Sequence, residues 1–158
     1  MTITDHPAVR TVSAALDDLG ASGTVRVLPD SARTAVEAAA ALSVEVGAIV
    51  NSLVFDADGL AVLVLTSGAH RVDTAKVAAD TGLPSLDRAT PDFVRSHTGQ
   101  AIGGVSPVGH PQPVRTFVDR WLERHETVWA AAGHPHAVFS TTYAELLTLT
   151  GGSAIDVA

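Results

Sequence analysis

The chain has 158 residues, of which 46% are hydrophobic and 17% are charged. This composition lies far from that of disordered chains, and the length fits one core, so we expect a single domain over residues 1–158. Ten Lys and Arg residues against 17 Asp and Glu residues give a formal net charge of −7. Such a charge excludes a basic surface that grips a long stretch of nucleic acid, and we expect no DNA partner.

The chain contains no cysteine, which excludes disulfides, thiolate metal sites and a cysteine nucleophile. No apolar run approaches the roughly 20 residues of a membrane-spanning helix. The first residues also lack the basic and then apolar segments of a signal peptide. We therefore expect a soluble, cytoplasmic protein without a membrane partner.

Helical and strand patterns alternate along the first half of the chain. Residues 7–19 carry apolar side chains at helical spacing, and residues 25–28 are typical of a short strand. A capping box at its start predicts a helix over residues 34–42. The apolar runs 49–55 and 60–65 flank a turn segment and predict two adjacent antiparallel strands.

The second half begins with two short helices. Asp73 has the position of a helix cap, and Thr90 followed by Pro91 predicts another helix start. The remaining elements are a glycine-rich and proline-rich loop at 99–109, strands at 114–118 and 127–132, and a capped helix at 142–149. Hairpin-like neighbours and helical crossovers both occur, so the sequence predicts an α/β (α+β) fold with a central mixed sheet flanked by helices.

The segment 99–107, GQAIGGVSP, is the most unusual local feature of the sequence. Paired glycines at Gly103 and Gly104 let the backbone come close to a ligand. Backbone N–H groups aimed at an ester carbonyl would stabilise the negative charge that develops on its oxygen during acyl transfer. A branched side chain at Gly104 would then fill the space of the ligand with little change in the fold. The alternative interpretation is a tight connection between two elements.

Two polar residues, Asn51 and Ser52, interrupt an otherwise apolar strand. Because successive side chains of a strand point to opposite faces, one of them should face the interior or a cleft. A buried amide needs hydrogen-bond partners, so Asn51 could bind a carbonyl or hydroxyl of a substrate. It could equally be satisfied by the neighbouring backbone.

Histidine and serine residues suggest weaker sites. His134 and His136 would share one face of a strand and could pair at a metal, but no third ligand lies nearby, so we expect no metal site and place His134 at the rim of a pocket. Ser106 lacks the flanking glycines of a nucleophile elbow.

Two further polar residues follow predicted strands. His70 lies between a strand and a helix, where a loop can reach a ligand phosphate. Asp119 follows the strand at 114–118 and either caps a turn or lines a site.

Several runs of sequence resemble the YbaK/EbsC family, which is related to the editing domain of prolyl-tRNA synthetases. The first runs are IVNSLVF (49–55), LVLTSG (63–68) and RVD (71–73) with Lys76. The order continues with Thr98-Gly99, GGVSP (103–107), Val118-Asp119 and Ala132-Gly133. The resemblance covers nearly the whole chain and is clearest over residues 34–147.

The resemblance implies an aminoacyl-tRNA deacylase, which hydrolyses the ester between a wrongly attached amino acid and the terminal adenosine of tRNA. It implies action in trans, of the kind that clears Cys- or Ala-tRNA(Pro). The implied partners are the 3′ aminoacyl end of tRNA and a prolyl-tRNA synthetase or another synthetase, and no cofactor is implied. The residues predicted as catalytic are Asn51, Gly103 and Gly104, and those predicted to bind substrate are Ser52, His70, Ser106, Pro107, Asp119, Gly133 and His134.

One position departs from the family. The family usually has a lysine where this chain has Asn51, and Lys76, the only lysine here, lies in a different predicted element. An ammonium has a full charge and three donors, whereas an amide has two weaker donors and one acceptor. Chemistry without the lysine would depend on the loop amides, with Asn51 and His134 as orienting groups. The alternative is a binding module that keeps the pocket for aminoacyl-adenosine or the tRNA end and has weak or no catalytic activity.

Overall fold

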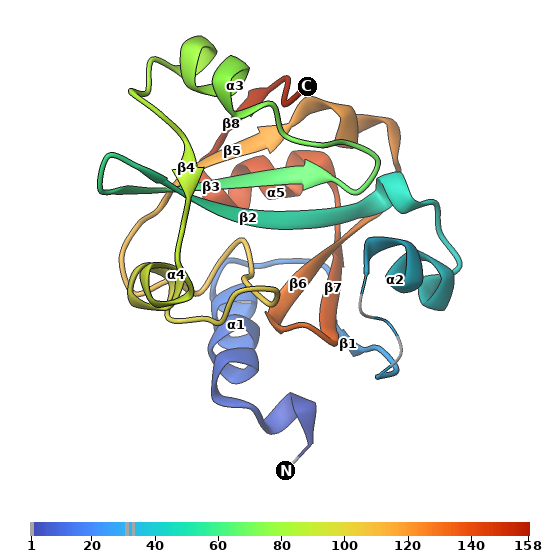
Figure 1. The fold of residues 1–158 in the computed structure, drawn as a ribbon. Coiled ribbons are helices and arrows are strands. Elements are labelled where there is room, and N and C mark those ends of the chain that lie inside the picture. The colour runs from blue at the N-terminus through green and yellow to red at the C-terminus, as the bar shows by residue number, and fades with distance from the viewer. Residues whose placement is uncertain (1, 31, 33) are drawn as a thin grey trace.

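The computed structural model describes residues 2–30, 32 and 34–158. In this part of the chain, five α-helices surround one mixed sheet of eight strands (Figure 1). The helices are α1 (Pro7–Asp18), α2 (Ala35–Leu42), α3 (Thr74–Thr81), α4 (Pro91–Thr98) and α5 (Tyr143–Thr150). The strands are β1 (Val25–Val27), β2 (Ile49–Ala57), β3 (Leu60–Ser67), β4 (Asp87–Arg88), β5 (Arg115–Asp119), β6 (Val128–His134), β7 (Ala137–Thr141) and β8 (Ser153–Ile155). The predicted α/β (α+β) class, with helices around a central mixed sheet, is confirmed.

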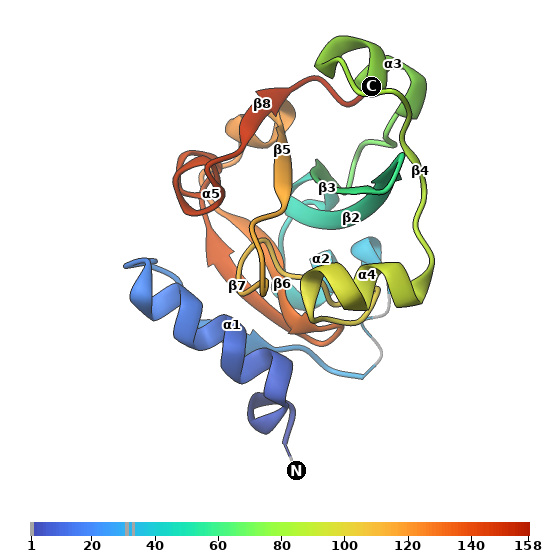
Figure 2. The same ribbon diagram turned by 90° about the vertical axis from the view of Figure 1, so that its left-hand side faces the viewer.

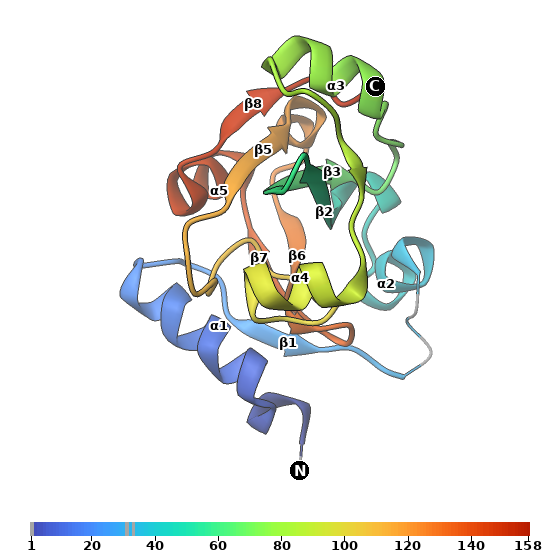
Figure 3. The same cartoon turned by 60° about the vertical axis from the view of Figure 1, so that its left-hand side comes forward.

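The sheet combines hairpins with parallel crossovers. Its strand order is β1-β7-β6-β2-β3-β5-β8, and β4 pairs with β2. The pairs β2/β3 and β6/β7 are antiparallel, whereas β2/β6, β3/β5 and β5/β8 are parallel. Buried side chains of α1, α4 and α5 form one core cluster on one face of the sheet, while α2 and α3 cover the other face. Figure 3 shows α1 running alongside β1 and the β6–β7 hairpin.

Local sequence signals produce the central hairpin. The predicted antiparallel pair is confirmed, and it runs from the Val50–Ser67 partners to the Ala57–Leu60 partners. Its turn uses Asp58 and Gly59, whose φ angles are 53° and 93°. Positive φ at both central residues matches the right-handed twist of the strands, which is why Asp-Gly is favoured in such turns.

Four of the predicted helix starts are capped by side chains. Thr34, Asp73, Thr90 and Thr142 each accept a hydrogen bond from the backbone N–H three residues later. These contacts satisfy donors that the first helical turn leaves free. The helix starts could therefore be predicted from the local sequence alone.

Three short strands were not predicted. They are β4, β7 and β8, and each pairs with a strand that is distant in the sequence or reached by a tight turn. The turn at Pro135 and His136 lies between β6 and β7, so His134 and His136 do not lie on one continuous strand as predicted. No helix among the described residues is long and apolar enough to cross a membrane.

One edge of β2 is open in its middle. On this side β6 pairs with Ile49 and Val50, and β4 pairs with Phe55 and Asp56. No strand of the described residues pairs with residues 51–54 on that side. Helices α2 and α4 flank this edge from opposite faces of the sheet (Figure 2).

The register decides which backbone groups face the open edge. Gly68 donates its N–H to the carbonyl of Ile49 over 2.7 Å, which makes Ile49 and every second residue after it bond toward β3. The N–H and C=O groups of Ser52 and Val54 therefore point away from β3, toward the open edge. An unpaired strand edge of this kind can bind an extended ligand through backbone hydrogen bonds.

Candidate active site

A cavity of about 420 Å³ lies at the open edge of β2; we call it the first cavity. Its walls are mostly apolar and come from both faces of the sheet, because the gap beside β2 joins the two faces. Residues of α2 and the loop before it form one wall, and residues of α4 and the glycine loop form the other. The lining includes Asn51, Ser52 and Gly103, which were predicted as functional residues.

Polar groups without partners line this cavity. The amide of Asn51 is half-buried and makes no hydrogen bond to another described residue. The Ser52 hydroxyl and the indole N–H of Trp129 are buried and also have no hydrogen-bond partner among the described residues. Buried polar groups are normally satisfied, so unpaired ones at a cavity indicate a place for a polar ligand.

The glycine loop reaches the cavity through Gly103, whose φ is 90°. The N–H of Gly103 has no acceptor among the described residues, whereas the N–H of Gly104 donates to the carbonyl of Ala101 over 3.1 Å. The carbonyl of Gly104 accepts a hydrogen bond from the N–H of Gly133 over 3.0 Å. Of the two predicted backbone donors, Gly103 is therefore the one that is free to bind a ligand in this conformation.

Ser106 and Pro107 lie behind the loop. Both are buried, and neither lines the first cavity. Ser106 donates its N–H to the side-chain carbonyl of Gln100 over 2.6 Å, and its hydroxyl accepts the N–H of Val108 over 3.3 Å. These bonds fix the shape of the loop, so any effect of Ser106 on a substrate would be exerted through the loop backbone.

Gly133 and His134 support the loop from the β6–β7 hairpin. Gly133 has a φ of 97°, and a Cβ there would lie 2.7 Å from the carbonyl oxygen of Ala8. The ring of His134 lies beside those of His6 and His136, with centroids 5.4 and 5.6 Å away. Neither Gly133 nor His134 lines the first cavity, although Pro135 between the two histidines does.

The surroundings of His134 favour the neutral form of its ring. Burial lowers its pKa from the ordinary value, and repulsion by His6 and His136 lowers it further, while Asp30 raises it. Its Nδ1 accepts the backbone N–H of His136 over 3.0 Å, so Nε2 carries the proton of the neutral ring. Among the described residues, no group of three or more His, Cys, Asp or Glu side chains could hold a metal ion.

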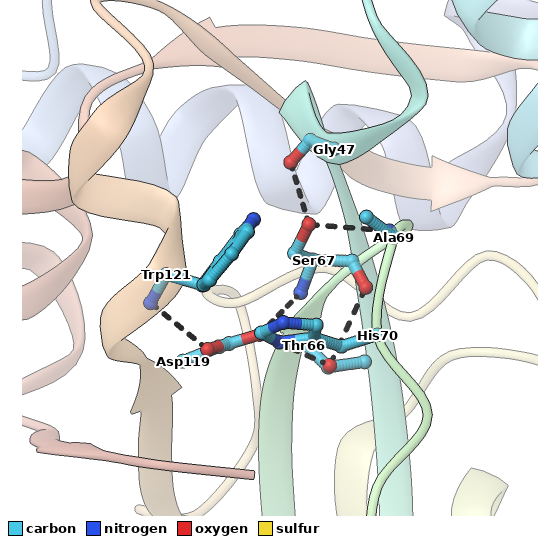
Figure 4. Close-up of polar contacts among 7 residues, drawn as sticks. All are labelled: Gly47, Thr66, Ser67, Ala69, His70, Asp119 and Trp121. Atoms are coloured by element: carbon cyan, nitrogen blue, oxygen red, sulfur yellow. Dashed lines mark hydrogen bonds and ion pairs between the residues drawn. The ribbon is translucent and has the colours of Figure 1, made fainter. Parts of the chain in front are cut away.

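His70 and Asp119 lie together, but in another part of the molecule. The Asp119 carboxylate is buried and accepts hydrogen bonds from the Thr66 hydroxyl (3.3 Å), the Ser67 N–H (3.0 Å) and the Trp121 N–H (3.0 Å) (Figure 4). Nδ1 of His70 lies 2.9 Å from the same carboxylate. Asp119 thus joins the ends of β3 and β5 to the turn of 3₁₀ helix Arg120–Arg124.

These two residues line a second cavity of about 540 Å³. The ring of His70 packs on the ring of Trp121 with centroids 4.6 Å apart. The guanidinium of Arg124 also lies over the ring of Trp121. The two cavities have no lining residue in common. A role of His70 and Asp119 in binding the substrate stays a prediction, and it would be exercised from the second cavity.

The structure places three of the predicted site residues, Asn51, Ser52 and Gly103, at one cavity. Three further polar residues line the same cavity and were not predicted as site residues: Thr34, Arg88 and Trp129. Trp129 lies in a predicted strand, and its unpaired indole N–H becomes visible only in the folded chain. Arg88 belongs to β4, which carries no strand signal of its own.

Comparison with known proteins identifies the family of the chain. A family model described as aminoacyl-tRNA editing domain matches residues 29–149. A proline–tRNA ligase of Nitratidesulfovibrio vulgaris is 30% identical over 154 residues, which are 98% of this chain and 25% of the ligase. The chain thus spans about a quarter of the length of that ligase.

Two similar proteins are close to this chain in size. The uncharacterized protein YwhH of Bacillus subtilis is 30% identical over 117 residues, which are 73% of this chain and 74% of YwhH. A crystal structure described as that of a candidate trans-editing enzyme for prolyl tRNA synthetase is 47% identical, with a TM-score of 0.90 and 96% of each chain covered. The family match over most of the chain, together with the shared fold, shows that the chain belongs to the aminoacyl-tRNA editing domain family.

Proposed function

We propose that this protein is an aminoacyl-tRNA deacylase that hydrolyses the ester between a wrongly attached amino acid and the terminal adenosine of tRNA. The observation that carries the proposal is the first cavity, where the Asn51 amide, the Ser52 hydroxyl and the Gly103 N–H lie without partners among the described residues. Family membership supplies the reaction class, and the cavity supplies a place for the ester.

The chemistry needs few groups from the protein. Water, or a water oriented by the free hydroxyl of the terminal ribose, attacks the ester carbonyl, and the Gly103 N–H stabilises the negative charge that forms on the carbonyl oxygen. The Asn51 amide orients the ester or the ribose hydroxyl. The bond to the ribose oxygen then breaks, the ribose oxygen takes a proton, and the amino acid leaves as a free acid.

The proposed substrates are tRNAs charged with a small wrong amino acid, of the kind represented by Cys- or Ala-tRNA(Pro). The similarity to a candidate trans-editing enzyme and to proline–tRNA ligases supports action in trans and association with a prolyl-tRNA synthetase. Because aminoacyl-tRNA is a component of translation, we place the reaction in the cytoplasm. The roles of Gly104, Ser106, Pro107, Gly133 and His134 in this proposal are to hold the loop that presents Gly103.

A second candidate function is a binding module for aminoacyl-adenosine or the tRNA end. The observation that favours it is Asn51, which provides no positive charge where the family usually has a lysine. A ligand would then occupy the first cavity without rapid hydrolysis. The two functions differ in the lifetime of the ester, which the enzyme shortens and the binding module leaves unchanged or prolongs.

The test is the deacylation rate of tRNAs charged with Ala, Cys, Ser, Thr or Pro. Native protein is compared with Asn51→Lys, with a no-protein control, and with Ser153→Lys, which adds the same charge at an exposed position of β8. We expect native protein to hydrolyse at least one of these esters faster than the no-protein control.

The variants separate the two functions. Activity that appears only in Asn51→Lys, and not in Ser153→Lys, would support the binding module and overturn the deacylase. If neither native protein nor any variant hydrolyses these esters faster than the no-protein control, the deacylase is overturned for these five amino acids.

A further inference from the structure

The lining of the first cavity is almost uncharged. Among the described residues that line it, Arg88 is the only one with an ionised side chain. The protein as a whole has a net charge of −7, so general attraction to nucleic acid is weak. A ligand with a phosphodiester group would therefore depend on Arg88 for its counter-charge.

Arg88 lies at one end of the open edge of β2. Its backbone pairs with Phe55, where β4 closes the edge, whereas Asn51 lies at the other end, directly after the last residue that pairs with β6. Residues 51 and 55 are about 13 Å apart along an extended strand. The cavity thus has a polar, uncharged end at Asn51 and Ser52 and a cationic end at Arg88.

The guanidinium of Arg88 is free to bind a ligand. The residue is exposed and forms no ion pair with another described residue. At the second cavity, Arg120 pairs with Asp156 over 3.1 Å, Lys76 pairs with Asp80, and Arg124 lies over the ring of Trp121. An arginine that has no internal partner and stands at the mouth of an apolar cavity is suited to bind an anionic group of a ligand.

We propose that Arg88 is a phosphate-binding residue of this site and holds the phosphodiester group next to the terminal adenosine of tRNA. The proposal rests on the proposed function, because it names a second contact in the same cavity. With the phosphate at Arg88, the nucleoside lies along the open edge of β2 and the ester lies toward Asn51 and Gly103. The planar fork of the guanidinium matches two phosphate oxygens, which a lysine at the same position does not. One such contact positions the substrate without a basic surface.

The first experiment measures the preference for a phosphate. Two small esters are compared, 3′-O-aminoacyl adenosine with and without a 5′-phosphate, each carrying the amino acid that native protein removes fastest from tRNA. Native protein should have a kcat/KM about tenfold higher for the phosphorylated ester. Arg88→Gln should lose this preference and Arg88→Lys should keep part of it. Arg10→Gln, which removes the same charge from an exposed position of α1, should keep all of it.

A second experiment does not require hydrolysis. The affinity for the trinucleotide CCA is measured between low and moderate salt for native protein, Arg88→Gln and Arg10→Gln. Loss of one phosphate contact should lower the magnitude of the slope of log K against log salt by about 0.7 in Arg88→Gln. Arg10→Gln should have the native slope.

The two experiments separate this proposal from the proposed function. Hydrolysis by native protein without a preference for the phosphorylated ester would overturn the role of Arg88 and leave the deacylase intact. An equal loss of that preference in Arg88→Gln and Arg10→Gln would do the same. Arg88-dependent binding of CCA without hydrolysis of any ester would overturn the deacylase and support the phosphate site. Native protein that shows neither a phosphate preference nor binding of CCA would overturn the phosphate site.

Discussion

Gly104 lies directly against the backbone of His134. A Cβ at Gly104 would stand 2.8 Å from the Cα of His134 and 2.9 Å from its backbone nitrogen, which is closer than real side chains approach backbone atoms. The glycine loop and the β6–β7 hairpin are therefore in contact through main chain on both sides. The expectation that Gly104 leaves space for a ligand is wrong, because His134 fills that space.

Gly104→Ala should move the loop away from the hairpin. The added methyl group collides with backbone that cannot rotate away, so the free energy of unfolding should fall by about 1–3 kcal/mol. Deacylation should fall as well, because Gly103 moves with the loop. Urea unfolding and deacylation rates measure the two effects. Leu60→Ala, at an exposed position outside the first cavity, is the control, and native stability in Gly104→Ala would contradict this contact.

Ser52→Ala should affect the ligand and not the fold. The Ser52 hydroxyl is buried and has no partner among the described residues, so its removal should leave the free energy of unfolding within about 0.5 kcal/mol of native. If the hydroxyl binds the substrate, kcat/KM falls. Thermal unfolding and steady-state kinetics check both statements, and a large loss of stability would show that the hydroxyl has a structural partner.

Asp119→Ala should destabilise the protein strongly. The substitution leaves the buried N–H groups of Ser67 and Trp121 and the Thr66 hydroxyl without their acceptor, together with Nδ1 of His70. The expected loss is about 3 kcal/mol in the free energy of unfolding. His70→Gln removes only one of the four partners and should cost less. Chemical denaturation gives the free energy of unfolding of the two variants. If both variants lose the same free energy of unfolding, the Asp119 carboxylate does not stabilise all four groups.

His6→Asn should raise the pKa of His134. Burial is the largest cause of the lowered pKa and stays in place, but the repulsion by His6 is removed. Asn is a good helix cap, so it can replace the His6 ring that caps α1 by accepting the Ala8 N–H. Titration of the His134 ring by NMR gives the pKa directly, with His97→Asn on α4 as the remote control. An unchanged value would mean that His6 has no electrostatic effect on His134.

The same shift makes stability depend on pH. A folded pKa below the unfolded value of 6.5 means that His134 contributes stability above pH 6.5, which is lost as the pH falls through the lowered folded pKa. In His6→Asn this loss should be smaller, because the folded and unfolded pKa values lie closer together. Unfolding free energies measured between pH 7 and pH 5 should show the smaller loss.

The local sequence determined the elements whose signals lie within a few residues. The caps at Thr34, Asp73, Thr90 and Thr142 bond to the third residue of their own helix, and the Asp58-Gly59 turn sets the β2–β3 hairpin. Asn51 and Ser52 could be selected as candidate site residues because a polar pair in an apolar strand is costly unless it has a partner, and both line the first cavity. The alternation of helix and strand patterns along the chain also predicted the mixed sheet with helices around it, which is confirmed.

Tertiary structure alone decided how these elements combine into a site. The cavity exists because β6 and β4 each pair with only part of the same edge of β2, and no local signal predicts where two distant strands diverge. The parallel pairing of β3 and β5 likewise places His70 and Asp119 at the second cavity, although sequence alone shows only that each of them lies at or after the end of a strand. Arg88 acquires its place from pairing with Phe55, a contact between residues far apart in the chain. Side chains separated in sequence meet only when long-range pairing and burial fix the register, so the site could not be predicted from local propensity.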